Sequence, residues 1–243
     1  MDAFIKTQSD TIIVDCVEYS AYPPPTAIVK VMKRRRAEQI VGTGSMRFGN
    51  LECYRQWENP VLGDPNDGEG MFLMKGHPYS VGSSNEVYAW CASLPVIAIE
   101  RIRVLARHGG YDCLIRIHKP GVLIQRLSSV LLVKYSSLLL HCAEVSYSRG
   151  AKIDKTILNS QKFHFNVFQK APEFAEDKEY RLSLTDARVK SAFRDDVIIQ
   201  VGDCSDIMDI EYLPTKGGSS KSDPEGHVKL TPDSTQAENE VPS

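Results

Sequence analysis

The stretch KEYRLSLTD, Lys178 to Asp186, alternates between polar and apolar residues and predicts a β-strand. Because successive side chains of a strand point to opposite faces, Glu179 and Arg181 share one face of it. Similar strand patterns recur along the chain, at residues 11–20, 45–51, 70–76, 86–93, 112–118, 138–148, 196–202 and 207–213.

Helical patterns interrupt these strands at irregular intervals. The longest cover residues 26–41, 95–109 and 120–131, and shorter ones cover 52–59 and 151–161. Thr26 is the candidate N-cap of the first helix, and the glycines after it provide its end. The elements do not follow a regular βαβ alternation, so the sequence predicts a single α+β domain with a mixed, mainly antiparallel sheet.

Composition sets the limits of the domain. The chain has 243 residues and a formal net charge of -2. We expect an ordered domain over residues 1–213 and a disordered tail over 214–243, where apolar residues become scarce. The small net charge gives no overall attraction to nucleic acid or to anionic membranes.

The six cysteines and the N-terminus point to one compartment. The cysteines are widely spread, without a C-x-x-C pair or zinc-type spacing, which favours reduced thiols in the cytoplasm. The N-terminus has no signal-peptide pattern and no run is apolar enough to span a membrane, so we expect a cytoplasmic protein without a membrane partner.

A dense polar segment, MRFGNLECYRQWENPVLGDPNDGEGMF, follows the first predicted helix. Its carboxylates Asp64, Asp67 and Glu69 could hold a hard cation such as Mg²⁺, or they could cap a solvated turn. Arg47 could bind a phosphate or carboxylate from its strand, or it could face solvent. We assign no residue as a metal ligand.

The strand VYAWCAS offers two aromatic rings and a terminal hydroxyl. Tyr88 and Trp90 lie on one face, where they could pack in the core or stack on a nicotinamide or a base. Ser93 ends the strand, where a hydroxyl is often exposed.

A second dense segment is FQKAPEFAEDKEYRLSL. Glu179 next to Arg181 could form a surface ion pair, or one of them could line a site, where a strand carboxylate can orient a ribose hydroxyl.

The run KVMKRRR concentrates cations between Lys30 and Arg36. These cations could contact the phosphates of a nucleic acid, or they could form the solvated C-terminal end of a helix, where they suit the helix dipole.

Together, the two dense segments resemble a broad bacterial family of unknown function. Its members combine a strand and helix of the form FG-x-L-x-x-YR, an NDPFDG-like loop, a CFS-like strand and a late E-x-E-YR strand. The counterparts here are MRFGNLECYR, GDPNDGEG, WCAS and FQKAPEFAEDKEYR. The chain departs from the pattern at Asn66, where an aromatic is usual, and at Ala92, which replaces a phenylalanine. The resemblance implies a bacterial cytosolic protein, often encoded near mobile or defence genes, and brings no established reaction.

The chain is also similar, more weakly, to ADP-ribosyltransferases of the arginine–serine–glutamate kind. Arg47, Ser93 and Glu179 follow the family's chain order, although the S-T-S triplet is missing and Glu176 stands three residues before Glu179 instead of two. In that family the arginine holds an NAD phosphate, the serine braces the site, and the glutamate orients the ribose as nicotinamide leaves.

Three functions follow as expectations. The first is a bacterial NAD-consuming effector, such as an ADP-ribosyltransferase-like toxin in antiviral (phage) defence, with NAD as substrate and Glu179 catalytic. In this reading Arg47 binds phosphate, and Tyr88 or Trp90 stacks. The second is a non-catalytic nucleotide- or partner-binding protein of a defence or toxin module. The third is a metal-dependent nucleic-acid-processing protein.

Overall fold

The computed structural model describes residues 5–6, 11–14, 17–20, 24–52, 55, 64–68, 70–74, 77–81, 87–147, 167–186 and 196–214. For the strands before residue 24 and between residues 70 and 81, the description covers backbone pairing alone. The predicted disordered tail and the short helix predicted at 151–161 lie outside the described residues, apart from Pro214.

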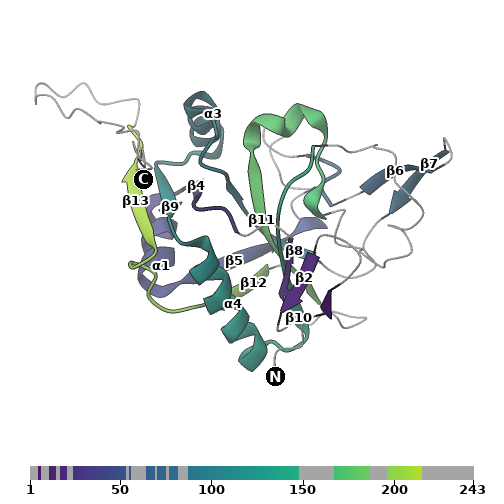
Figure 1. The fold of residues 1–243 in the computed structure, drawn as a ribbon. Coiled ribbons are helices and arrows are strands. Elements are labelled where there is room, and N and C mark those ends of the chain that lie inside the picture. The colour runs from purple at the N-terminus through teal and green to yellow at the C-terminus, as the bar shows by residue number, and fades with distance from the viewer. Residues whose placement is uncertain are drawn as a thin grey trace, which may run out of the picture.

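Most described strands belong to one large sheet (Figure 1). Its strands are β1 (Ile5–Lys6), β2 (Thr11–Val14), β3 (Val17–Ser20), β4 (Ile28–Met32), β5 (Ser45–Asn50), β8 (Val87–Ser93), β9 (Cys113–Ile117), β10 (Leu138–Glu144), β11 (Glu179–Asp186), β12 (Asp196–Gln200) and β13 (Met208–Tyr212). A separate hairpin consists of β6 (Gly70–Met74) and β7 (His77–Val81).

Among the described strands, pairing is antiparallel except between β3 and β10. The main path runs β1-β2-β3-β10-β11-β8-β4-β9-β13, and β5 and β12 branch from β8. With the described α-helices beside this sheet, the predicted α+β class with a mainly antiparallel sheet is confirmed. The stretch expected as one strand over 11–20 is instead a hairpin of β2 and β3.

The sheet divides at β8. One side of β8 pairs with β11 along its whole length, while the other side pairs with β4 at Ser93 and with β5 at Tyr88 and Ala89. Between those points, the Cys91 carbonyl accepts a hydrogen bond from Lys30 Nζ. A side-chain amine thus takes the place of a backbone donor where β4 and β5 diverge.

The α-helices are α1 (Arg34–Thr43), α3 (Ile99–Gly109) and α4 (Pro120–Lys134), and a 3₁₀ helix, η2, covers Pro172–Asp177. The helix predicted over 95–109 is α3, which begins four residues later, at Ile99, and α4 begins at the predicted proline and extends to Lys134. The expected helix over 26–41 is wrong in its first half, because Ile28–Met32 is strand β4. Apolar residues at 28, 31 and 32 fit a helix, but this run is also rich in β-branched residues and pairs with β9.

This correction moves the basic run to the other end of the helix. Lys30 lies on β4, whereas Lys33 to Arg36 form the N-terminal turn of α1 instead of its C-terminal end. Gly44 ends α1 in a left-handed conformation, as the GTG sequence predicts.

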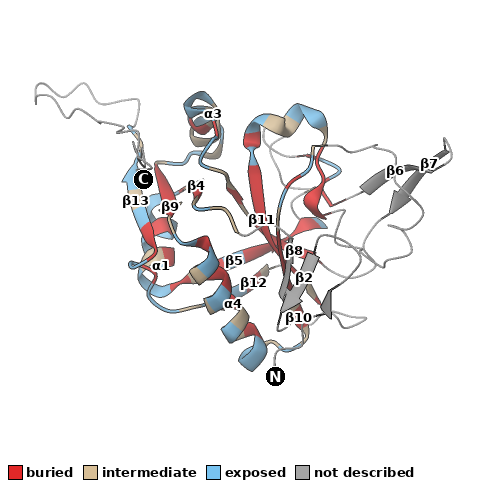
Figure 2. Ribbon diagram, viewed as in Figure 1, coloured by how far each residue is buried: buried red, intermediate tan, exposed pale blue. Residues whose placement is uncertain are grey.

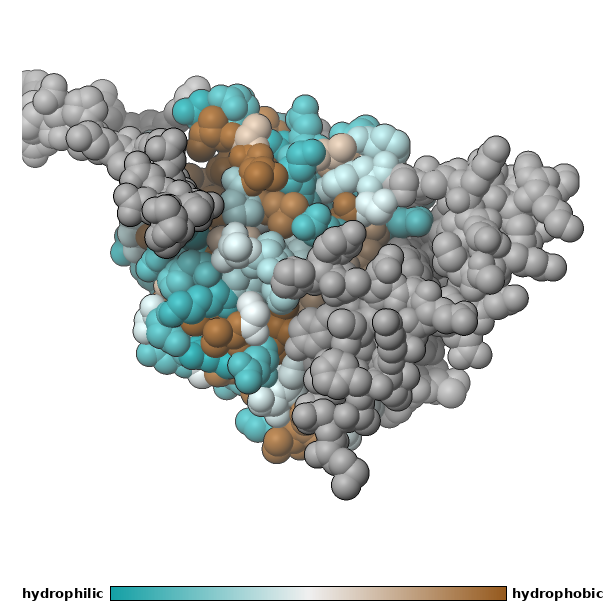
Figure 3. Space-filling view, viewed as in Figure 1, coloured by the Kyte–Doolittle hydropathy of each residue, from teal (hydrophilic) through white to brown (hydrophobic). Residues whose placement is uncertain are grey.

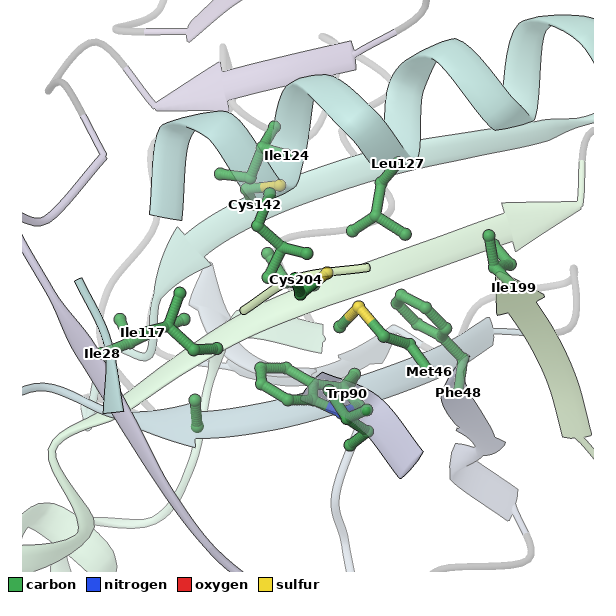
Figure 4. Close-up of a cluster of buried hydrophobic side chains, with 14 of the residues drawn as sticks. Ile28, Met46, Phe48, Trp90, Ile117, Ile124, Leu127, Cys142, Ile199 and Cys204 are labelled. Atoms are coloured by element: carbon green, nitrogen blue, oxygen red, sulfur yellow. The ribbon is translucent and has the colours of Figure 1, made fainter. Parts of the chain in front are cut away.

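The main hydrophobic core lies on one face of the sheet, beneath α4 (Figures 2 and 4). Met46 and Phe48 of β5 meet Trp90 of β8 there, and Ile124 and Leu127 of α4 close the cluster from above. This leaves the opposite face of β5, β8 and β11 for other contacts.

Candidate functional site

Arg181 is the centre of the candidate site. Its side chain is completely buried on β11, yet its guanidinium binds a carboxylate through both terminal nitrogens. The distances are 2.8 Å from Nη1 to Asp67 Oδ1 and 2.7 Å from Nη2 to Asp67 Oδ2. Arg181 Nε also donates to Glu179 Oε1 at 2.6 Å, and Nη1 donates to the Val167 carbonyl. The rigid fork of an arginine suits this geometry, and a lysine could not reproduce it.

Two further cations complete the arrangement. Lys170 Nζ lies 2.8 Å from Glu179 Oε2 and 3.9 Å from Asp177 Oδ2. Arg101, on α3, donates from Nε to Asp177 Oδ1 at 2.6 Å. Three cations therefore face three carboxylates, which we call the ion cluster: Asp67, Arg101, Lys170, Asp177, Glu179 and Arg181. The balance of charge explains how so many ionised groups are tolerated away from water.

Local turns bring these residues together from distant parts of the chain. The Asp64 carboxylate accepts the backbone N–H of Asn66 at 3.0 Å, and its carbonyl accepts that of Asp67 at 2.9 Å. This tight turn aims Asp67 at the sheet. On the other side, η2 ends at Lys178, whose left-handed φ of 46° redirects the chain into β11.

The electrostatics keep Glu179 ionised. Burial alone would raise the pKa of its carboxyl, but the charges of Arg181 and Lys170 more than offset burial and hold that pKa well below its usual range. The Asp177 carboxyl behaves differently, because burial dominates there and raises its pKa. The pKa values of Glu179 and Asp177 are thus shifted in opposite directions.

Neighbouring groups that could act as nucleophiles or acids are kept neutral. Burial, with a further contribution from Glu179, raises the pKa of the Cys91 thiol to about 12. Burial likewise raises the pKa of Tyr147 to about 12, and its hydroxyl oxygen accepts the backbone N–H of Glu179 at 2.8 Å. Neither group is an activated nucleophile.

Three predicted site residues share one face of the sheet. Ser93 is directly opposite Glu179 in the pairing of β8 with β11. Gly49 is opposite Ala89 in the pairing of β5 with β8, so Arg47, two positions before Gly49, points to that face as well. The side chains differ in access, because Arg47 is exposed, Ser93 is half-buried and Glu179 is only 5% exposed.

Arg47 already has an internal partner. Its Nε donates to Asp196 Oδ2 at 2.6 Å, and its side chain remains 59% exposed. The guanidinium therefore sits at the surface, beside the branch formed by β5 and β12, and is not part of the ion cluster.

Tyr88 and Trp90 lie on the other face. Their exposed fractions are 0% and 3%, and both belong to the main core beneath α4. Of the two roles considered from the sequence, the structure places these rings in core packing, away from the face that carries Glu179.

The carboxylate-rich loop also points inward. Asp64 and Asp67 are buried, and both oxygens of Asp67 bind Arg181. Glu69 lies outside the described residues. Within the residues that the structure describes, no group of three or more His, Cys, Asp or Glu side chains could hold a metal ion.

The pair of Glu179 and Arg181 is buried, so the expectation of a surface pair is wrong. Sequence reasoning also did not assign roles to Lys170, Asp177 and Arg101. The sequence contained one signal for Asp177, because an acidic residue stands there two positions before Glu179. Asp177 is buried, whereas Glu176 is exposed. The contact between Asp67 and Arg181, 114 positions apart in the chain, has no local signature.

Comparisons of this chain with protein-family models, with curated proteins and with solved structures found no match. Among the described helices, none is long and apolar enough to cross a membrane.

Proposed function

We propose that this chain is a non-catalytic nucleotide-binding protein, of the kind that serves a defence or toxin module. The observation that carries this proposal is the state of Glu179. Both of its oxygens are bound by cations of the same chain, at 2.6 Å and 2.8 Å, and the residue is 5% exposed. A carboxylate in this state would have to break two buried ion pairs before it could orient a ribose hydroxyl.

The ion cluster acts instead as a support. It joins the loop around Asp67 to β11 and ties η2 to α3 through Asp177 and Arg101. Elements that frame the sheet face beside Ser93 are thereby fixed, which lowers the cost of ordering them when a ligand binds. Arg47 supplies an exposed guanidinium on the same face for a phosphate group, in exchange for its contact with Asp196.

The test combines binding with turnover. We expect NAD, ADP-ribose or AMP to raise the melting temperature of the protein, without release of nicotinamide from NAD in mass spectrometry. Arg47→Gln should reduce the shift in melting temperature. Arg103→Gln, which changes an exposed arginine on α3, is the matched control and should leave the shift unchanged. Absence of a shift with every nucleotide would contradict the proposal.

A second candidate, an NAD-consuming ADP-ribosyltransferase-like effector, is favoured by one observation. Ser93 and Glu179 are opposite each other across adjacent strands, and Arg47 projects from the same face. If this candidate is correct, the protein incubated with NAD and bacterial lysate will release nicotinamide. That release will disappear in Glu179→Gln while the melting transition is retained.

A further inference from the structure

The start of α1, the end of α3 and the end of β13 converge on one residue, Asp112. Its carboxylate accepts the backbone N–H of Arg34 at 2.6 Å, its own N–H donates to the Met32 carbonyl, and its carbonyl accepts the N–H of Leu213 at 2.9 Å. Asp112 follows α3 by three residues. These three segments therefore meet at one end of the sheet, where α1 and α3 pack against opposite faces of β4.

Among the exposed side chains at this end, cations outnumber the carboxylates Glu38 and Glu211. We call the exposed basic and aromatic side chains of this end the basic surface: Lys33, Arg34, Arg35, Arg36, Arg107, His108, Tyr111 and Tyr212. In Figure 3 the visible area around α1 is largely hydrophilic. None of these residues belongs to the ion cluster.

Several of the cations have no internal counter-charge. Arg34 binds Glu38, and Arg36 donates to the Gln39 side chain. Lys33, Arg35 and Arg107 make no ion pair or side-chain hydrogen bond with the rest of the described chain. Their charges are therefore available to an external anion, although the whole chain carries a net charge of -2.

The position of these cations is unfavourable for the helix itself. The first turn of α1 contains no acidic residue, and the side chain of the N-cap residue, Lys33, makes no capping hydrogen bond. Positive charges at the positive end of the helix dipole destabilise a helix. The Asp112 carboxylate offsets part of this cost, because it accepts the backbone N–H of Arg34, whereas Lys33 and Arg35 have no carboxylate partner among the described residues.

Aromatic rings stand among the cations. The Tyr212 side chain is 57% exposed, and its ring centroid lies 4.8 Å from the Arg34 guanidinium. Tyr111, which is 37% exposed, follows the last turn of α3. Cations that contact phosphates, beside exposed rings on which bases can stack, form the usual combination for binding a single-stranded nucleic acid.

We infer that the basic surface binds single-stranded nucleic acid, with Lys33, Arg35 and Arg107 at the phosphates and Tyr212 stacking on a base. A duplex keeps its bases stacked inside and would leave the tyrosine without that contact, and an acidic protein segment would not need the ring. This inference uses none of the residues of the proposed nucleotide site and does not rest on it.

Fluorescence anisotropy with labelled oligothymidylate and oligouridylate of about 20 nucleotides, longer than one typical binding site, tests the inference. We expect binding to a single strand that weakens with added salt. Lys33→Gln, Arg35→Gln and Arg107→Gln should each reduce the slope of log affinity against log salt concentration by about 0.7. Lys134→Gln, at the far end of α4, is the matched control and should bind like the wild type (Figure 1).

The tyrosine has its own pair of variants. Tyr212→Ala should weaken single-strand binding by about tenfold, because the stacked base is lost, and Tyr212→Phe should restore it because the ring is kept. A duplex of equal length that binds as tightly as the single strand would overturn the inference. So would equal binding by wild type and all charge variants, or no binding at low salt. These outcomes are separate from those of the nucleotide test, which reads melting temperature and nicotinamide.

Discussion

At the scale of single residues, the complete burial of Arg181 depends on its carboxylate partners. An arginine without exposed surface is tolerated here because Asp67 and Glu179 neutralise it and accept its N–H groups. Removing one partner of such a buried pair costs more than the pair itself contributes, because the other charge is left in a medium that solvates it poorly.

We therefore expect Asp67→Asn to destabilise the protein by about 3–5 kcal/mol in urea unfolding, since the shape is kept but the charge facing Arg181 is lost. Asp196→Asn provides a control, because it removes the carboxylate from the exposed pair with Arg47. That change should cost less than about 1 kcal/mol. Equal losses in the two variants would show that the ion cluster is not the stabilising unit described here.

At the scale of secondary-structure elements, the junction of α1 with β5 depends on one glycine. Gly44 has φ of 62°, and a Cβ atom added to it would meet the Gly202 carbonyl and lie 2.6 Å from Val201 Cγ2. The close approach of Gly44 to residues 201–202 supports the fold, because the Gly44 carbonyl accepts the N–H of Val201 at 3.2 Å. A side chain here would be strained in its backbone and would also clash with a neighbouring segment.

Two alanine substitutions two residues apart should therefore have opposite effects. Gly44→Ala should reduce the free energy of unfolding by more than about 2 kcal/mol, through left-handed strain and overlap. Gly42→Ala, inside α1, meets nothing within 4 Å and should increase it by up to about 1 kcal/mol through helix propensity. Thermal unfolding of both variants measures this, and a stabilised Gly44→Ala protein would refute the assigned contact.

Many of the strands and helices could be predicted from local sequence patterns. The strands from 45, 87, 113, 138, 179, 196 and 208 and the helices α3 and α4 follow from local periodicity. Residues 28–32 were mispredicted because a short apolar run fits both a helix and a strand, and only its pairing with β9 decides. The ion cluster could be predicted in part, through the dense segments around Asp67 and Glu179. Its closure through Lys170 and Arg101 depends on tertiary contacts that no local pattern encodes.

At the scale of the whole molecule, the central sheet separates two environments. One face of β5, β8 and β11 packs an apolar core beneath α4, and the other carries the ion cluster, at the β8–β11 pair. The stability of the molecule therefore depends on pH through groups in its interior.

Acid should weaken the fold through Glu179. The folded-state pKa of Glu179 lies below the unfolded value of about 4.3, so its contribution is fully present above about pH 5 and is lost as the pH falls below that. Asp177 acts in the opposite direction because its folded-state pKa is raised. Glu179→Gln should flatten the acid side of a plot of unfolding free energy against pH. Glu173→Gln, which changes an exposed carboxylate on η2, should keep the wild-type slope. An unchanged slope in Glu179→Gln would contradict this assignment.

The divergence of β4 and β5 along β8 has an optical consequence. Lys30 Nζ lies 4.8 Å from the centre of the Trp90 ring while it donates to the Cys91 carbonyl. The fluorescence of a buried indole beside an ammonium group differs from that of an indole in water. Trp90 is therefore an intrinsic fluorescent probe at the point where the sheet divides. With Trp57 replaced, its emission would follow, without any label, whether the two strands keep their separate positions when a ligand binds or the chain unfolds.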